Sequence, residues 1–111
     1  MERRATTGRT PDGRLTVDFH ARRAVADGRV VDLTYGDCSL LLGLIEQGEE
    51  FRDAGDLGRR VWNFSWAGER EVAVRLGYLR AKLGRDWVES TARGHRLGRP
   101  PLPDTAGPPA P

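Results

Sequence analysis

A chain of 111 residues, 38% hydrophobic and 31% charged, has room for one small domain with a modest core. It contains no apolar run near the roughly 20 residues that a membrane-spanning helix needs, and its first residues lack the apolar segment of a signal peptide. One cysteine excludes an internal disulfide and, with only two histidines, gives no zinc-ligand spacing. We therefore expect a cytoplasmic protein without a metal or cofactor.

The formal net charge of +2 is unevenly distributed along the chain. Residues 15–68 carry six arginines against nine acidic residues, whereas residues 69–99 carry eight basic residues against four acidic ones. A local positive excess suits a polyanion such as nucleic acid, although a solvated charged surface gives the same pattern. Charge alone leaves both interpretations open.

The two ends of the chain differ in composition from its middle. Residues 1–13 contain Thr, Gly, Pro and Arg without hydrophobic periodicity, which predicts a disordered arm. Residues 99–111 are rich in proline, which predicts a disordered tail. The folded domain is therefore expected within residues 14–98.

The first elements expected in this domain are β-strands. Alternating apolar residues in 15–19 indicate a half-buried strand. A tight hairpin follows, because Asp27 and Gly28 lie between the apolar segments 24–26 and 30–33, and both residues tolerate a positive φ. Together these segments predict a small N-terminal antiparallel sheet.

The first of three expected helices covers about residues 34–47. Thr34 is a suitable N-cap, Asp37 completes an approximate capping box, and Gly48 ends the helix. Apolar residues at helical spacing form its buried face, with Cys38 on or near it. We interpret Cys38 as a core residue rather than a nucleophile, because no histidine is near it in the sequence.

A second helix is expected over about residues 54–62, with Asp53 as its N-cap. The loop that follows contains two large aromatic residues, Phe64 and Trp66. Aromatic residues usually belong to the core, but in a loop they also suit a contact with a partner protein. Both interpretations of Phe64 and Trp66 stay open.

The most informative segment is the third expected helix, residues 69–84. Four apolar residues recur along it at helical spacing: Val72, Leu76, Leu79 and Leu83. Arginines lie off this stripe, and a short basic hairpin is expected over residues 87–97. A helix that buries one face and offers arginines elsewhere is suited to a polyanion. The order sheet, three helices, hairpin is that of a winged helix-turn-helix, an α+β fold.

Five sequence motifs support this architecture. They are Asp27-Gly28-Arg29 with Leu33-Thr34, Leu40-Leu41, Leu57 with Val61-Trp62, Arg70-x-Val72-x-Val74-x-Leu76-x-x-Leu79-Arg80-x-Lys82-Leu83, and Arg93-Gly94-His95-Arg96-Leu97. In this order they resemble the OmpR/PhoB-type effector domain of bacterial response regulators, over residues 15–98. The resemblance implies an N-terminal antiparallel sheet, three helices and a C-terminal hairpin wing, which here is shorter than the family pattern.

The resemblance also implies binding to double-stranded DNA, with the third helix in the major groove and the wing at the neighbouring minor groove. Carried over by position, contacts to phosphates or nearby bases fall to Arg70, Arg75, Arg80 and Lys82 in the helix and to Arg93 and Arg96 in the wing. The loop that contains Phe64 and Trp66 corresponds to one that can contact RNA polymerase in this family.

The third helix departs from the family pattern at the positions that would face base edges, which are Ala73, Val74, Gly77 and Tyr78. These residues suit thymine methyl groups but offer few hydrogen bonds to bases. Gly77 also costs the helix about 1 kcal/mol relative to alanine. We therefore expect backbone contact more than sequence readout. Selectivity would then need a second copy, as a dimer on DNA, or a partner protein.

The leading hypothesis is a DNA-binding transcriptional regulator. The alternative is a winged-helix interaction module that docks RNA polymerase or another regulator through the smooth face around Tyr78. We expect no enzyme, because His20 and His95 lack an obvious nucleophile partner. The 111 residues include no receiver domain, so we expect no phosphorylation switch of the usual kind. The native-looking start and long tails favour a stand-alone protein over a fragment.

Overall fold

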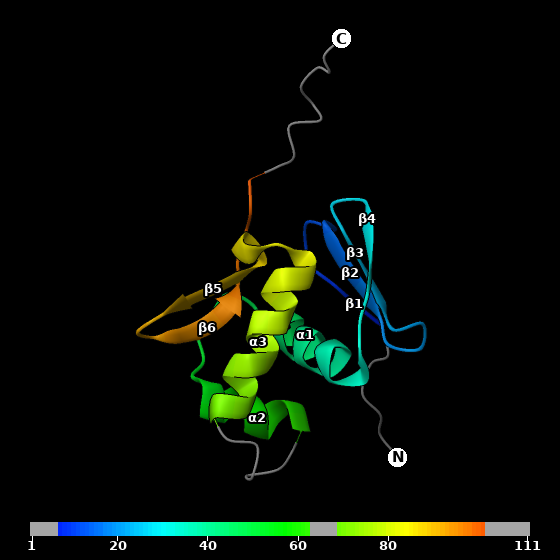
Figure 1. Ribbon diagram of the computed structural model, residues 1–111. Helices are drawn as coiled ribbons and strands as arrows, with labels where there is room; N and C mark the ends of the chain where they lie inside the picture. The colour runs from blue at the N-terminus through cyan, green and yellow to red at the C-terminus, as the bar shows by residue number, and fades with distance from the viewer. Residues whose placement is uncertain (1–6, 63–68, 102–111) are drawn as a thin grey trace.

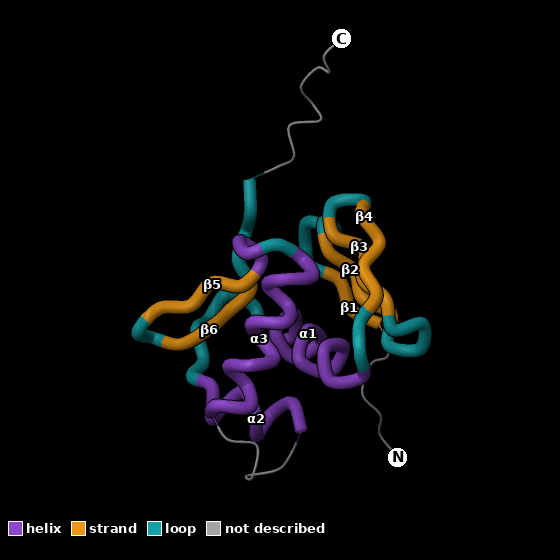
Figure 2. Tube along the Cα trace, viewed as in Figure 1, coloured by secondary structure: helices purple, strands orange, loops and turns teal. Residues whose placement is uncertain are grey.

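The computed structural model describes residues 7–62 and 69–101, in which a four-stranded sheet, three helices and a two-stranded hairpin follow one another (Figure 1). Their bounds are β1 Thr7–Arg9, β2 Leu15–Asp18, β3 Arg23–Ala26, β4 Arg29–Asp32, α1 Tyr35–Gln47, α2 Ala54–Trp62, α3 Glu69–Leu83, the 3₁₀ turn η1 Arg85–Trp87, β5 Val88–Thr91 and β6 Gly94–Leu97. This order confirms the predicted α+β winged-helix architecture. Helices α1 and α3 lie between the sheet and the hairpin, and α2 lies below them in the view of Figure 2.

The N-terminal sheet is antiparallel throughout, in the order β1-β2-β3-β4. The predicted hairpin joins β3 to β4, and Asp27 and Gly28 form its two-residue turn with φ values of 50° and 85°. The Arg14 guanidinium holds this turn, because two of its nitrogens donate to the Asp27 carboxylate at 2.8 Å each. This hydrogen-bonded ion pair lowers the pKa of Asp27 below its ordinary value.

The prediction of a disordered arm over residues 1–13 is wrong for the part that the structure describes. Residues 7–9 form β1 and pair with β2, with Gly8 opposite Val17. Gly8 lets the strand lie directly against α1, since a Cβ atom there would come within 2.8 Å of a Leu42 methyl. Such a short strand leaves no periodicity to detect in the sequence. Residues 1–6, and residues 102–111 of the predicted tail, lie outside the described residues.

Helix α1 begins with the predicted capping box. The Thr34 hydroxyl accepts a hydrogen bond from the backbone N–H of Asp37, and the Asp37 carboxylate accepts one from the N–H of Thr34, both at 3.1 Å. Gly48 ends the helix with φ 75°, and Cys38 is fully buried in the core, as expected. No helix within residues 7–62 and 69–101 is long and apolar enough to cross a membrane.

The core is a single cluster around α1, which contacts the sheet, the hairpin and both other helices. Helix α3 contributes the four-residue stripe expected from the sequence, which we call the inner stripe: Val72, Leu76, Leu79 and Leu83, each at most 1% exposed. Burial of this stripe fixes the rotation of α3 about its axis. The opposite side of the helix must therefore face away from the core.

Candidate nucleic-acid interface

The outward side of α3 is apolar or small along most of its length. We call it the outer strip, and its residues are Ala73, Val74, Gly77, Tyr78 and Ala81, all of them exposed. The side chains of Val74 and Tyr78 are 45% and 53% exposed, and a Cβ atom added at Gly77 would meet nothing within 4 Å. Among the described residues no other element covers this strip.

Arg75 lies on the border of the outer strip that faces the start of α1. Its guanidinium passes over Gly36, where an added Cβ would come within 2.8 Å of it, and it forms a long ion pair of 3.6 Å with Glu71. The side chain remains 31% exposed. Arg70, in the first turn of α3, is exposed. Contacts of these two arginines with DNA phosphates stay a prediction.

Lys82 lies on the same border as Arg75 but is committed to the fold. Its Nζ atom donates to the carboxylate of Asp37 at 2.6 Å, and Asp37 is 1% exposed. Burial raises the pKa of Asp37, but hydrogen bonds from Lys82 and Thr34 outweigh it and hold this pKa below 3.8. The pair ties α3 to the capping box of α1. A DNA contact by Lys82 stays a prediction.

The opposite border of the outer strip is linked to the hairpin by a polar cluster. Arg80 donates to the hydroxyl oxygen of Ser90, and that oxygen lies 2.7 Å from Nδ1 of His95. Ser90 and His95 face each other across the β5–β6 ladder. Burial, and then the charge of Arg80, lower the pKa of His95 below 6.5, so the neutral ring is favoured. The cluster places Arg80 between helix and wing.

The wing is anchored to the segment between α1 and α2. Phe51 in that segment lies under two wing arginines, with its ring centroid 4.2 Å from Arg96 and 5.3 Å from Arg93. Arg96 also donates to Glu89 at 3.0 Å and to the backbone oxygen of Glu49 at 2.7 Å. Arg96 is therefore a structural anchor of the hairpin, whereas Arg93 is exposed in the turn at its tip.

A second attachment of the wing is made through backbone atoms. Arg52 and His95 exchange two N–H to carbonyl hydrogen bonds, of 3.0 and 2.8 Å. Gly94, with φ 125°, makes this approach possible, because a Cβ atom there would overlap the carbonyl oxygen of Arg52. The hairpin and the α1–α2 segment thus form one connected surface beside α3.

Arg29 holds the C-terminal end of α3 and was not expected to do so. Its guanidinium donates to the backbone oxygens of Leu83 at 2.7 Å and of Lys82 at 3.3 Å. These carbonyls have no partner within the helix, so a positive side chain there satisfies them and complements the helix dipole. In the sequence, Arg29 stands out only as part of the Asp27-Gly28-Arg29 motif. Nothing in that motif indicates a contact with Lys82, 53 residues later.

Arg70, Arg75, Tyr78 and Arg80 lie on α3 outside its buried stripe, and the hairpin that carries Arg93 contacts this helix through Ser90. Phe64 and Trp66 lie outside the described residues, so their contact with a partner stays a prediction. Sequence reasoning missed Ser90 and Phe51, which position Arg80 and Arg93. Only the strand register and the path of the α1–α2 segment bring these pairs together.

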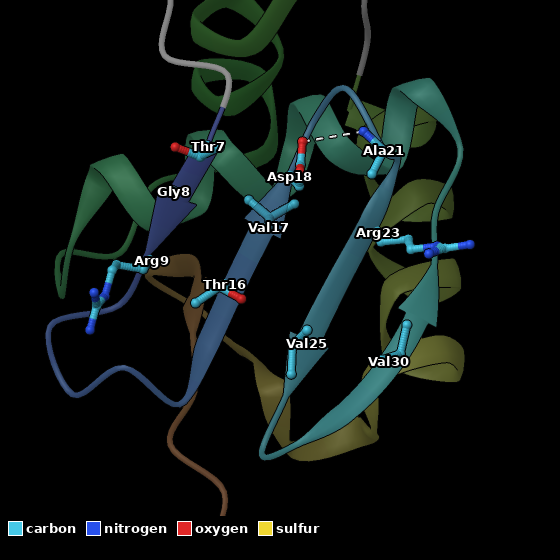
Figure 3. A pocket seen from close by; sticks show the side chains of 10 residues that line it. All are labelled: Thr7, Gly8, Arg9, Thr16, Val17, Asp18, Ala21, Arg23, Val25 and Val30. Atoms are coloured by element: carbon cyan, nitrogen blue, oxygen red, sulfur yellow. Dashed lines mark hydrogen bonds between the residues drawn. The ribbon is translucent and has the colours of Figure 1, made fainter.

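A separate hollow of about 670 Å³ lies on the outer face of the N-terminal sheet. Figure 3 shows Val25 and Val30 at one end of it and Arg9 with Thr7 at the other. Threonine and valine make up half of its lining. Two of its charged side chains have partners within the fold, because Asp18 accepts from the N–H of Ala21 and Arg23 pairs with Asp32. This lining offers no group that indicates a ligand.

Comparison with known proteins supports the resemblance drawn from the motifs. No protein-family model matches the chain. Over 72 residues it is 39% identical to the transcriptional regulatory protein PrrA of Mycobacterium bovis, and equally to PrrA of Mycobacterium tuberculosis and of Mycobacterium leprae. The match covers 64% of this chain and 31% of each relative, so the chain corresponds to about a third of their length.

Solved structures of DNA-binding domains share the fold. The DNA-binding domain of CadC from E. coli matches with a TM-score of 0.69 at 18% identity, covering 89% of this chain and 96% of that one. That of CpxR from E. coli matches with 0.64 at 20% identity, covering 84% and 96%. That of RstA from Klebsiella pneumoniae matches with 0.63 at 22% identity, covering 88% and 91%. The chain thus shares the winged-helix fold of these three DNA-binding domains.

Proposed function

We propose that this chain binds double-stranded DNA through α3 and the β5–β6 hairpin and acts as a transcriptional regulator in the bacterial cytoplasm. The observation that carries the proposal is the exposed outer strip of α3 with arginines on its borders. The likeness to regulators and DNA-binding domains supports it. A major groove about 12 Å wide admits one α-helix, and arginines beside that helix then meet the phosphates.

Each residue predicted to bind DNA has a part in this proposal. Arg70, Arg75 and Arg80 contact phosphates, and Arg93 contacts the backbone or the minor groove from the tip of the wing. Lys82 and Arg96 act mainly by holding α3 and the hairpin in place, because their charged groups already bind Asp37 and Glu89. Tyr78 faces the groove from the outer strip.

The test is a titration of a fluorescently labelled random-sequence duplex at several salt concentrations. Counterion release makes the logarithm of affinity fall by about 0.9 per phosphate contact for each unit in the logarithm of salt concentration. Arg75→Ala and Arg80→Ala each weaken binding about equally on different sequences and flatten this slope by roughly one unit.

Arg23→Ala is the matched control, because it removes an exposed arginine of β3 whose partner is Asp32 on the neighbouring strand. Its affinity and salt slope stay near those of the original protein. Unchanged DNA affinity in both α3 variants, with the fold intact by circular dichroism, would show that α3 is not the DNA face.

The uncharged character of the outer strip favours a second candidate function. A smooth face with an exposed tyrosine suits a protein surface, and RNA polymerase or another regulator would be the partner. The predicted partner contacts of Phe64 and Trp66 belong to the same candidate function. Binding to a partner that is lost in Tyr78→Ala, without measurable DNA binding, would place this function first.

Sedimentation with and without a duplex tests whether two copies of the chain bind DNA as a dimer.

A further inference from the structure

We infer that the outer strip of α3 recognises thymine through its 5-methyl group in the major groove. This inference rests on the proposed DNA-binding function. It goes beyond that function because it specifies which feature of the base pairs the helix contacts. The target sequences would then be rich in A·T pairs at the positions that face Val74 and Tyr78.

The outer strip is chemically apolar over almost all of its exposed surface. Its exposed groups are methyl, isopropyl and aromatic carbons, and the only polar side-chain atom is the Tyr78 hydroxyl. Arg75 lies over Gly36 on one border, and Arg80 binds Ser90 on the other. The exposed Arg70 and Glu71 precede the strip in the first turn of the helix. The centre of the strip therefore offers neither amide nor guanidinium groups to a base edge.

The major groove of DNA offers such a surface one apolar feature. Every base pair presents hydrogen-bond donors and acceptors there, but thymine alone among the four bases adds a methyl group. An apolar surface gains free energy by removing such a methyl from water. The same surface over a G·C pair would remove water from polar atoms without replacing their hydrogen bonds, which is unfavourable. The strip therefore discriminates by the presence of a methyl group.

The charges beside the strip favour DNA, rather than a protein, as its occupant. Arg75 lies on one border, where it forms a long ion pair with Glu71, and Arg80 lies on the other, so positive groups stand on both sides of an uncharged centre. A major groove has the complementary arrangement, with base edges on its floor and phosphates along both walls.

Gly77 strengthens this arrangement by its small size. It lies between Val74 and Ala81 along the strip, and the space beyond its Cα atom is open. Without a side chain at that point, the floor of the groove approaches the helix backbone closely enough for both neighbours to reach methyl groups. A longer side chain there would hold the helix away from the bases.

The experiment compares two duplexes of equal length that differ only in the methyl group. One has an alternating A/T sequence, and the other has uracil at every thymine. The original protein binds the thymine duplex roughly tenfold more tightly, since each methyl removed from water contributes about fourfold and two contacts suffice. An alternating G/C duplex gains affinity when its cytosines carry a 5-methyl group.

Two variants assign the effect to the strip. Val74→Ala lowers the thymine-to-uracil ratio about threefold, because it removes two methyl groups from the contact. Val30→Ala truncates another exposed valine, which lies on β4, and leaves the ratio unchanged. Measurement of both variants at two salt concentrations shows that the phosphate contacts are intact.

The outcomes separate this inference from the proposed function. Equal affinity for the two duplexes, with strong salt dependence, overturns thymine recognition but leaves DNA binding in place. A ratio that persists in Val74→Ala shows that other residues detect the methyl group and overturns the assignment to the strip. No binding to any duplex overturns the proposed function itself.

Discussion

The two long faces of α3 have similar side chains and opposite surroundings. The inner stripe consists of leucine and valine and is buried almost completely, whereas the outer strip consists of valine, alanine, glycine and tyrosine and is exposed. Hydrophobicity alone therefore does not say which apolar residues stabilise the fold. The contacts of each face do, and they predict that the inner stripe governs stability and the outer strip governs recognition.

The largest expected effect comes from truncation of the inner stripe. Leu79→Ala removes a fully buried side chain from the contact of α3 with the core and should lower the free energy of unfolding by about 3 kcal/mol. Val74→Ala, on the outer strip of the same helix, should change it by less than about 0.5 kcal/mol. Urea denaturation followed by circular dichroism measures both. Equal losses would refute the division between the faces.

The ion pair on the border between the faces should have the next largest effect. Asp37→Ala removes the partner of Lys82 and half of the capping box, so we expect a loss of about 2 kcal/mol at pH 7. The pKa of Asp37 lies below 3.8 in the folded chain, so its ionised carboxylate stabilises the fold. This contribution is present above pH 3.8 and is lost as the pH falls through the folded pKa.

Denaturation curves of the original protein and Asp37→Ala from pH 7 to pH 2 measure this dependence. The difference in unfolding free energy between them should shrink at the acidic end. A difference that stays constant over the whole range would show that the carboxylate contributes through its shape and not through its charge.

A stabilising change is expected on the outer strip. Gly77→Ala should raise the free energy of unfolding by about 1 kcal/mol, because alanine favours the helix and the added methyl meets no atom within 4 Å. Thermal denaturation measures the change, with Ala73→Gly as the reverse substitution on the same strip. A lower melting temperature for Gly77→Ala would mean that the outer strip is packed rather than open.

The smallest effect on stability is expected at the C-terminal end of α3, where the inner stripe and the outer strip both end. Arg29→Ala removes the side chain that satisfies the last carbonyls of α3 and should cost about 0.5 kcal/mol. Arg23→Ala, which removes a surface arginine paired only with exposed Asp32, provides the comparison and should cost less. Hydrogen exchange of the last-turn amides in α3 should rise in Arg29→Ala alone.

Local patterns in the sequence predicted much of this fold. The three helices begin and end within one residue of the expected bounds, because caps and periodicity act over a few neighbouring residues. The Asp27-Gly28 turn was predictable for the same reason. These are features in which the residues that interact are also close in the chain.

The interactions missed in the sequence join distant residues. Lys82 meets Asp37 across 45 residues, and no local pattern indicates this ion pair. Strand β1 depends on the close approach of Gly8 to Leu42, and no local sequence pattern indicates this contact. Of the candidate site, the residue types and the helix were predictable, but the division into anchoring and exposed basic groups required the tertiary arrangement.

Two glycines in this small domain set opposite limits on how its sequence can vary. Gly94 lies against the backbone of Arg52 at a positive φ, so sequence variants of this domain must keep glycine there for the wing to stay attached. Position 77 opens to solvent, so folding places almost no demand on it. A library randomised at both positions and selected for folding alone would return glycine at 94 and a broad mixture at 77. New binding preferences can therefore arise at position 77 without loss of the wing.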